Sequence, residues 1–281
     1  MAVKYGIGEI FGQDFASLSS SEIRKASKCK HRKIDCPFKS GKCNKAGGVC
    51  SLQAYSNDNN TVEPVDDTLV ATCPNRFYEN NLIFRWVGNE MIGSNSPIIL
   101  TELPFLMAQE ANQTRAVGRI DMVLVNMKGE DELDWCALEM QSVYFSGRSI
   151  TEELRQLRNY RDHGTPFPIG TRRPDFRSSG PKRLMPQLQI KVPTITRWGK
   201  KTVVIVDRPF WNSLGEMPTV DHVSNCDIAW FVLDYQRKGN KFEVQAGDVF
   251  LTTLDRAVEG LTGGTPTSLA VFEKTLRERL N

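Results

Sequence analysis

The sequence has few of the features that membrane, secreted or nucleotide-binding proteins require. Only three histidines occur among the 281 residues, and they lack the spacing of metal-binding pairs. The sequence also has no recognisable serine or cysteine catalytic arrangement and no glycine-rich phosphate loop. Its apolar runs fall far short of the roughly 20 residues of a membrane span, and its N-terminus has no signal-peptide pattern. We therefore expect a cytoplasmic protein that does not contact a membrane.

The overall composition is that of an ordinary globular protein. Hydrophobic residues make up 40% and charged residues 25% of the chain, so a sizeable core is expected. The chain contains seven cysteines, which in a reducing compartment argue against a disulfide framework. Cysteines that cluster in such a chain more often bind a metal ion.

The composition changes near residue 80, which predicts two domains, 1–80 and 81–281. The first holds five of the seven cysteines and a polar stretch at 56–67 that we interpret as an exposed loop. The second has the alternating patterns of a mixed α/β (α+β) domain. Helices are predicted at 102–112, 149–163, 251–261 and 268–280, and strands at 119–127, 135–143, 202–206, 228–235 and 242–246.

The N-terminal cysteines form a candidate metal site. They are Cys29, Cys36, Cys43, Cys50 and Cys73, which gives five candidates for four tetrahedral positions. Thiolates suit Zn²⁺ or a single iron ion. The first three intervals are six residues long, unlike the shorter knuckles of common zinc sites. Buried thiols without a metal are the alternative.

Two neighbouring predicted strands each carry a carboxylate in an apolar setting. Glu139 and Gln141 share one face of the strand 135–143, and Asp121 lies in the preceding strand. A charge in such a strand is costly unless it is paired or binds a cation. Two carboxylates on adjacent strands suit Mg²⁺. The alternative is a strand whose acids form salt bridges with the arginines of the following helix.

Positive charge is concentrated in two segments. Residues 24–45 and 170–201 each contain nine lysines and arginines against one aspartate. This concentration predicts contacts with DNA phosphates, although soluble basic loops would have the same composition. The second segment contains prolines and is interpreted as a loop able to enter a groove. Its candidate DNA-binding residues are Arg172, Arg173, Arg177, Lys182 and Arg183.

The residues around four of the cysteines resemble the metal-binding segment of the NotI restriction endonuclease family. They read Cys36-Pro37-Phe38, Cys43, Gly48-Val49-Cys50 and Cys73-Pro74-Asn75-Arg76. The resemblance implies that these four cysteines hold one structural iron and that Cys29 does not take part. Zn²⁺ would suit the same ligands, so the choice of iron follows from the resemblance. Asn75 and Arg76 either neutralise the metal–thiolate centre or, for Arg76, contact DNA.

The acidic strand is similar to the same family. Leu138-Glu139-Met140-Gln141, with Gly147 shortly after, resembles its variant of the PD-(D/E)xK active site, which has glutamine where lysine is usual. The resemblance implies a PD-(D/E)xK nuclease core, with a mixed central sheet flanked by helices, and a small N-terminal metal-binding domain built on the four cysteines. It also implies catalytic roles for Asp121, Glu139 and Gln141, with Mg²⁺ bound by Asp121 and Glu139.

The function implied is that of a Type II restriction endonuclease. Such an enzyme would cut both strands of double-stranded DNA at a specific, GC-rich palindromic site and leave five-prime phosphates. A homodimer would match the symmetry of the site, and a cognate DNA methyltransferase would protect the host. One alternative is a non-catalytic, metal-stabilised DNA-binding protein. Another is a nuclease with a repair or transposition role.

Overall fold

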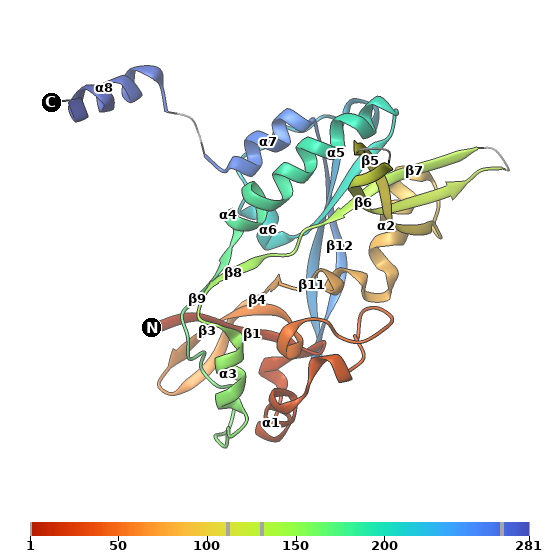
Figure 1. The fold of residues 1–281 in the computed structure, drawn as a ribbon. Helices are drawn as coiled ribbons and strands as arrows, with labels where there is room; N and C mark the ends of the chain where they lie inside the picture. The colour runs from red at the N-terminus through yellow and green to blue at the C-terminus, as the bar shows by residue number, and fades with distance from the viewer. Residues whose placement is uncertain (1, 111–112, 130–131, 265–266, 281) are drawn as a thin grey trace.

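The computed structural model describes residues 2–110, 113–129, 132–264 and 267–280, and the strands in these ranges form two sheets and a ribbon (Figure 1). The N-terminal sheet has the order β2-β1-β3-β4, the large sheet the order β12-β11-β10-β7-β6-β5, and the ribbon pairs β8 with β9. The strands are β1 (Ala2–Ile10), β2 (Gln13–Asp14), β3 (Val49–Asp58), β4 (Thr61–Ala71), β5 (Ile98–Glu110), β6 (Gln113–Met127), β7 (Leu133–Met140), β8 (Tyr144–Gly147), β9 (Arg172–Asp175), β10 (Lys201–Asp207), β11 (Ile228–Lys238) and β12 (Lys241–Thr252).

Helices cover both faces of the large sheet. Helix α2 contacts β6, β7 and β12 on one face, and α5 packs on β10 and against α7 on the other (Figure 1). The helices are α1 (Ser20–Lys28), α2 (Leu82–Ile92), α3 (Ile150–Leu157), α4 (Phe176–Ser179), α5 (Met185–Arg197), α6 (Arg208–Asn212), α7 (Leu254–Thr262) and α8 (Leu269–Leu280). Within the described ranges, no helix has the length and apolar character needed to cross a membrane.

The large sheet is mixed, and its central strands alternate between two cores. Strands β7, β10 and β11 run parallel to one another, while β5, β6 and β12 pair antiparallel with their neighbours. Cys136 and Leu138 face the core beneath α2, whereas Ala137 joins Ile195 of α5 in the core on the other face. Odd-numbered positions of β7 therefore face α5, and Glu139 is one of them.

The N-terminal sheet includes a helix from later in the chain. Ile7 of β1 and Leu52 of β3 share a core with Leu154 and Leu157 of α3, and α3 also packs on α1. The ends of this sheet join the cores of the large sheet, because Val70 and Ala71 of β4 are buried there. The domain boundary at residue 80 stays a prediction.

Several predicted elements are confirmed. The predicted strands 119–127, 202–206, 228–235 and 242–246 lie inside β6, β10, β11 and β12, and α8 agrees with the last predicted helix. Others differ in length. Strand β7 ends at Met140 rather than residue 143, α3 spans eight residues rather than fifteen, and α7 begins three residues later than predicted.

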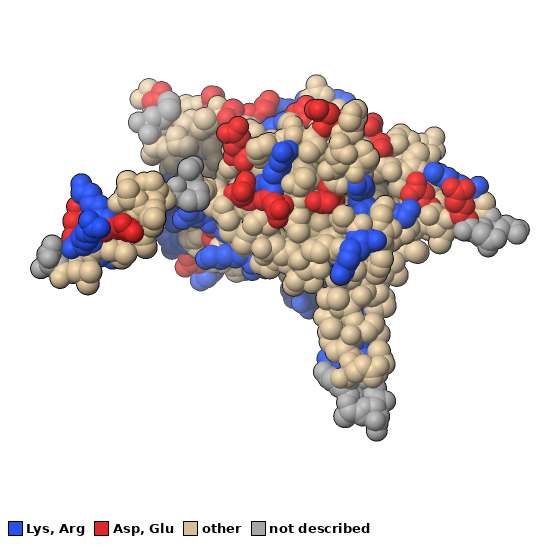
Figure 2. Space-filling view, turned by 90° about the horizontal axis from the view of Figure 1, so that it is seen from above, with Lys and Arg blue, Asp and Glu red and all other residues tan. Residues whose placement is uncertain are grey.

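The predicted helix at 102–112 is wrong. Its described part belongs to β5, and 111–112 lie outside the described residues. Strand β5 pairs with β6 from Ile98 onward, so cross-strand hydrogen bonds and packing override local helix propensity. This hairpin projects from the body and bears few charged side chains (Figure 2).

Two predicted loops are also regular structure. The polar stretch 56–67 belongs to the β3–β4 hairpin, in which Asn59 and Asn60 make the turn with positive φ angles. The segment 176–197 is a helical run through α4, a π turn at Gly180–Leu184 and α5. Pro181 and Pro186 lie in first turns, where the missing N–H group is not needed.

Candidate active site and cysteine cluster

Asp121 and Glu139 lie side by side on the face of the large sheet that α5 covers. Met122 of β6 pairs with Leu138 of β7, so the next pair outward along these antiparallel strands is Asp121 with Glu139. The Glu139 side chain is 4% exposed, and that of Asp121 is 59% exposed. The structure thus brings together the two carboxylates that the sequence placed on neighbouring strands, one inside the protein and one at the opening.

The ammonium group of Lys191 occupies the space between these carboxylates. Its Nζ atom contacts Oε1 of Glu139 and lies 3.5 Å from Oδ1 of Asp121. Its third neighbour is Oε1 of Gln187, also at 3.5 Å, one turn earlier on α5. A lysine ammonium has three N–H donors, so all three have an acceptor nearby.

The surroundings of Glu139 disfavour its charged form. Burial raises the pKa of the carboxyl to about 7, and the charge and hydrogen bond of Asp121 add to this rise. The charge and hydrogen bond of Lys191 act in the opposite direction. The two carboxyl groups repel each other when both are ionised, and the ammonium group of Lys191 offsets only part of this repulsion. A further cation bound between them would therefore be stabilised.

Gln141 lies just beyond the end of β7 and continues its pairing with β10. Its N–H donates to the carbonyl oxygen of Ile205 (3.0 Å). Its side chain is buried, and Nε2 donates to the carbonyl oxygen of Ser142 (2.5 Å). The residue thus follows the strand directly instead of lying within it, and its amide group is turned toward its own backbone.

Lys191 is the residue of this site that the sequence analysis missed, because it was counted only as part of a basic segment. A signal was present in the sequence. Leu188, Val192 and Ile195 form the buried face of α5, and Lys191 lies on that face at helical spacing. The preceding residue, Ile190, is 57% exposed. A lysine at a core position beside an exposed isoleucine is the same kind of incongruity that singled out Glu139.

Arg172, which we predicted to contact DNA, is a structural residue instead. Its side chain is buried and forms an ion pair with Glu153 of α3. Its Nε donates to the carbonyl oxygen of Arg148 (2.7 Å). Reaching a DNA base would break this buried ion pair and leave Glu153 uncompensated.

The other four predicted DNA-binding residues have exposed side chains near the C-terminal end of β7. Arg183 stacks on the ring of Tyr144 in β8 (3.7 Å) and donates to its hydroxyl group (3.0 Å). Arg173 of β9 donates to the Ser146 hydroxyl group (3.1 Å). Arg177 and Lys182 are exposed on α4 and the following π turn.

Four cysteines lie close enough to influence one another's ionisation. Cys36 and Cys43 act electrostatically on Cys73, and Cys73 acts on Cys50. Burial raises the pKa of Cys43, Cys50 and Cys73, and most strongly that of Cys50. Cys29 lies at the end of α1, where its thiol donates to the carbonyl oxygen of Lys25 (3.2 Å).

These four thiols are the donors that an iron or zinc ion would need, but they are not arranged as ligands around a single point. Across the described residues, no group of three or more histidine, cysteine or acidic side chains has the spacing to hold a metal ion. All seven cysteines are free thiols. The chemistry of the donor set therefore fits the predicted metal.

The residues after Cys73 lie beside the cysteine cluster, and the charge of Arg76 counteracts the rise in the pKa of Cys50. Arg76 is fully buried, and its Nε donates to Oε2 of Glu9 (2.9 Å). It also donates to Oε2 of Glu79 (2.8 Å) and to the carbonyl oxygen of Phe242 (2.9 Å). Contact between Arg76 and DNA is therefore excluded in this structure. Asn75 lies at the cysteine cluster, with Nδ2 4.0 Å from Sγ of Cys36.

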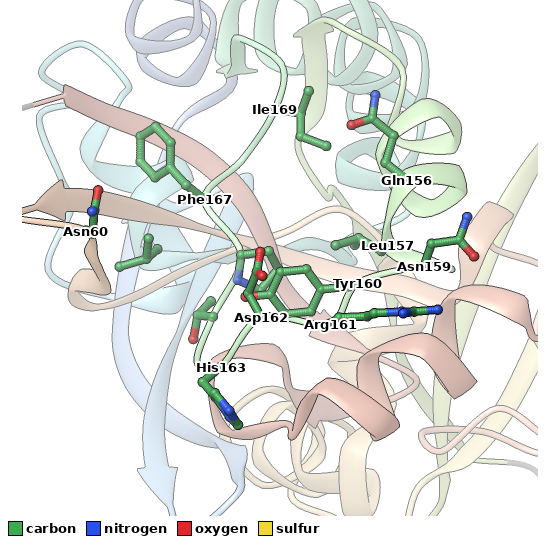
Figure 3. A pocket seen from close by; sticks show the side chains of 13 residues that line it. Asn60, Gln156, Leu157, Asn159, Tyr160, Arg161, Asp162, His163, Phe167 and Ile169 are labelled. Carbon is green, nitrogen blue, oxygen red and sulfur yellow. The ribbon is translucent and has the colours of Figure 1, made fainter.

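A cavity of about 730 Å³ lies away from the acidic pair (Figure 3). It is formed by the end of α3, the segment 159–169 and residues near the β3–β4 turn. Tyr160, Arg161, His163 and Phe167 are among the side chains that line it. The predicted catalytic and metal-binding residues do not line this cavity.

Comparison with known proteins gives one result at the level of the family. The model of the family described as "Restriction endonuclease NotI" matches residues 18–246. No curated protein matches the chain. The matched range covers well over half of the sequence and contains the cysteine cluster, both carboxylates and Lys191. The chain belongs to the NotI restriction endonuclease family.

Proposed function

We propose that this protein is a Type II restriction endonuclease that hydrolyses both strands of double-stranded DNA in a Mg²⁺-dependent reaction. Its family makes it a DNA-cleaving hydrolase. The observation that carries the finer proposal is the meeting of Asp121 and Glu139 around one ammonium group. The mixed central sheet with helices on both faces is the architecture expected of a PD-(D/E)xK nuclease core.

Asp121 and Glu139 would hold Mg²⁺. Their oxygen donors suit this ion, and the space between them already stabilises a positive charge. When bound, Mg²⁺ would polarise the scissile phosphate and lower the pKa of an attacking water. The partial exposure of Asp121 leaves one side of the pair open to a DNA backbone.

The reaction is an in-line displacement at phosphorus. The water oxygen forms a bond to phosphorus, and the bond from phosphorus to the 3′ oxygen breaks. One proton of the water ends on that oxygen and the other passes to solvent, which leaves a phosphate on the five-prime end. Gln141 would orient the water once its amide turns from Ser142, but a neutral amide cannot act as the base.

DNA would lie across the exposed basic residues near β7. Arg173, Arg177, Lys182 and Arg183 are available for phosphates and guanine edges, and Arg172 is removed from the predicted set. A two-fold homodimer would match a palindromic, GC-rich site and cut both strands. The enzyme would act in the cytoplasm, with a cognate DNA methyltransferase protecting the host genome.

Cys36, Cys43, Cys50 and Cys73 would bind one structural metal ion, with iron proposed and Zn²⁺ as the second candidate. The grouping of these four thiols supports the proposal, as does the position of Cys29 at the end of α1. Metal analysis tests it. Cys73→Ser should remove the metal from the purified protein, whereas Cys29→Ser should retain it. A folded wild-type protein that contains neither metal would contradict it.

The geometry favours a nuclease over a non-catalytic DNA-binding protein. A binding protein has no need for a buried acid and an exposed acid side by side near its DNA-facing surface, because they repel phosphates. The charge of Glu139 is also costly to bury, which a purely structural strand residue would avoid. A nuclease with a repair or transposition role would use the same chemistry, and the pattern of fragments separates it from a restriction enzyme.

The decisive experiment is incubation of the protein with unmethylated genomic DNA, with and without Mg²⁺. Discrete fragments that share one end sequence are expected with Mg²⁺ only. Glu139→Ala should abolish cutting and leave DNA binding in Ca²⁺ intact. Absence of cleavage with every divalent metal tested would overturn the proposal.

A further inference from the structure

Lys191 has a position that packing alone does not explain. Its side chain is 9% exposed and lies on the buried face of α5, between the apolar contacts of Leu188 and Ile195. The neighbouring residue Ile190 faces solvent instead. An isoleucine at position 191 and a lysine at position 190 would place the apolar side chain in the core and the charged one in solvent. The lysine is therefore held in the interior by its contacts with the acidic pair.

The charge of the site points to the purpose of this lysine. With both carboxyl groups ionised, as ligation of a metal ion requires, Asp121 and Glu139 carry two negative charges and Lys191 one positive charge. With a divalent cation bound, the site as a whole carries one positive charge, which matches the single negative charge of a phosphodiester. Without Lys191 the loaded site would be neutral toward an anionic substrate whose negative charge grows during the reaction.

Strand β7 does not supply this charge. Gln141 is neutral and occupies the position two residues after Glu139, at the end of the strand. The ammonium group comes instead from α5, which crosses the same face of the sheet. The basic group and the strand thus reach the acidic pair from different elements of the fold.

We propose that Lys191 is a catalytic residue of the cleavage reaction. Its ammonium group contacts the scissile phosphate and stabilises the negative charge that develops as the water oxygen bonds to phosphorus and the bond to the 3′ oxygen breaks. In the absence of metal it holds the two carboxylates together. This inference rests on the proposed Mg²⁺-dependent site at Asp121 and Glu139.

The test compares Lys191→Met with Lys191→Arg in single-turnover cleavage of unmethylated genomic DNA. Removal of one charge-stabilising group typically slows a reaction by about 100-fold or more. We expect this loss for Lys191→Met, with DNA binding in Ca²⁺ unchanged, and a smaller loss for Lys191→Arg. Lys241→Met, at an exposed turn between β11 and β12, is the matched control and should cut normally.

A second variant moves the charge back to the strand. Gln141→Lys combined with Lys191→Met should cut at least about tenfold faster than Lys191→Met alone, because the ammonium group again faces the acidic pair. A lysine needed only for packing would not be replaced in this way. If Lys191→Met fails to fold, Lys191→Gln serves as the parent for the same comparison.

Metal binding provides a measurement that does not depend on cleavage. The ammonium group and a divalent cation compete for the same oxygens, so calorimetry with Mn²⁺ should show tighter binding by Lys191→Met than by the wild type. Normal cutting by Lys191→Met overturns the inference. The inference is also overturned if Lys191→Met loses cutting and DNA binding to the same extent and neither Lys191→Arg nor the double variant recovers cutting. Failure of the proposed function itself would show separately, as cleavage that survives both Asp121→Asn and Glu139→Gln.

Discussion

Two buried charge clusters of this molecule differ in whether solvent can reach them. The Glu9–Arg76 cluster, at the junction of the N-terminal sheet with the large sheet, is sealed: both side chains have no exposed surface. The Glu139–Lys191–Asp121 cluster is open, because Asp121 is mostly exposed. Both clusters bury a glutamate on a strand beside a basic side chain. The closed cluster has no surface for a ligand, whereas the open one is accessible from solvent.

Removing the acid should therefore affect cleavage in the open cluster and the stability of the fold in the closed cluster. Glu139→Gln is expected to reduce cleavage by at least about 1,000-fold, equivalent to roughly 4 kcal/mol of barrier, while the protein remains folded. Glu9→Gln should lower the free energy of unfolding and leave cleavage by the remaining folded protein unchanged. Cleavage assays with denaturation curves on both variants measure the contrast. Equal activity of the two variants would remove the distinction between the clusters.

The closed cluster should be the more sensitive of the two to loss of its basic partner. Arg76→Met leaves Glu9 buried and unpaired, which typically costs about 3–5 kcal/mol of stability. Replacing Arg76 and Glu9 together by apolar residues should recover much of this loss. Urea denaturation measures both effects, with the exposed Arg85→Met as the control. If Arg76→Met were as stable as the wild type, Glu9 would have to be protonated or hydrogen-bonded to water in the variant.

A third buried acid makes stability depend on pH. Burial raises the pKa of Asp207 to about 7, although the N–H groups of Ala71 (2.6 Å) and Phe210 (3.0 Å) donate to its carboxyl group. Between its ordinary value near 4 and about 7, the folded state holds one more proton than the unfolded state. The contribution of Asp207 to the free energy of unfolding is therefore largest below pH 4 and falls until pH 7.

Denaturation curves of the wild type and Asp207→Asn between pH 5 and 8 measure this contribution. The variant lacks the ionisable group, so the difference between the two proteins should change steadily up to about pH 7 and then level off. Parallel curves across the whole range would show that Asp207 keeps an ordinary pKa.

The smallest effect is expected from the C-terminal helix. Every residue of α8 is exposed, and the helix lies away from the body (Figure 1). Deleting residues 267–281 should leave the melting temperature and cleavage unchanged. Leu261→Ala in α7 is the contrasting variant, because it removes a buried side chain and should cost about 2–5 kcal/mol. A clear loss of stability on deletion would mean that α8 packs against the protein in solution.

Strand patterns and isolated charges could be predicted from the sequence because each depends on local information. Alternation within 119–127 and 135–143 predicted the faces of β6 and β7, and the carboxylates of Asp121 and Glu139 stood out against apolar neighbours. Lys191 could be linked to them only once α5 was known to cross that face of the sheet. Prolines hid this helix: Pro181 and Pro186 lie in first turns and Pro193 lies inside α5, and composition does not reveal these positions.

In the N-terminal part, the candidate metal ligands could be predicted from the sequence, but the hairpin and the role of Arg76 could not. Cysteine spacing left five candidates, and the family resemblance selected Cys36, Cys43, Cys50 and Cys73, which lie near one another in the structure. The β3–β4 hairpin escaped notice because its polar residues lie in the largely exposed distal part of the two strands, around an asparagine turn. Arg76 could not be assigned, because its partner Glu9 lies far away in the sequence on β1.

The order of the site residues along the chain has a consequence for synthesis. Asp121 and Glu139 leave the ribosome well before Lys191, and β7 gains its second neighbour only when β10, which ends at Asp207, has formed. Contacts between distant segments form late in folding because they close long loops. A nascent chain shorter than about 210 residues therefore lacks the complete site at Asp121, Glu139 and Lys191. If these residues cleave DNA as proposed, cleavage activity would arise only after most of the protein has been made.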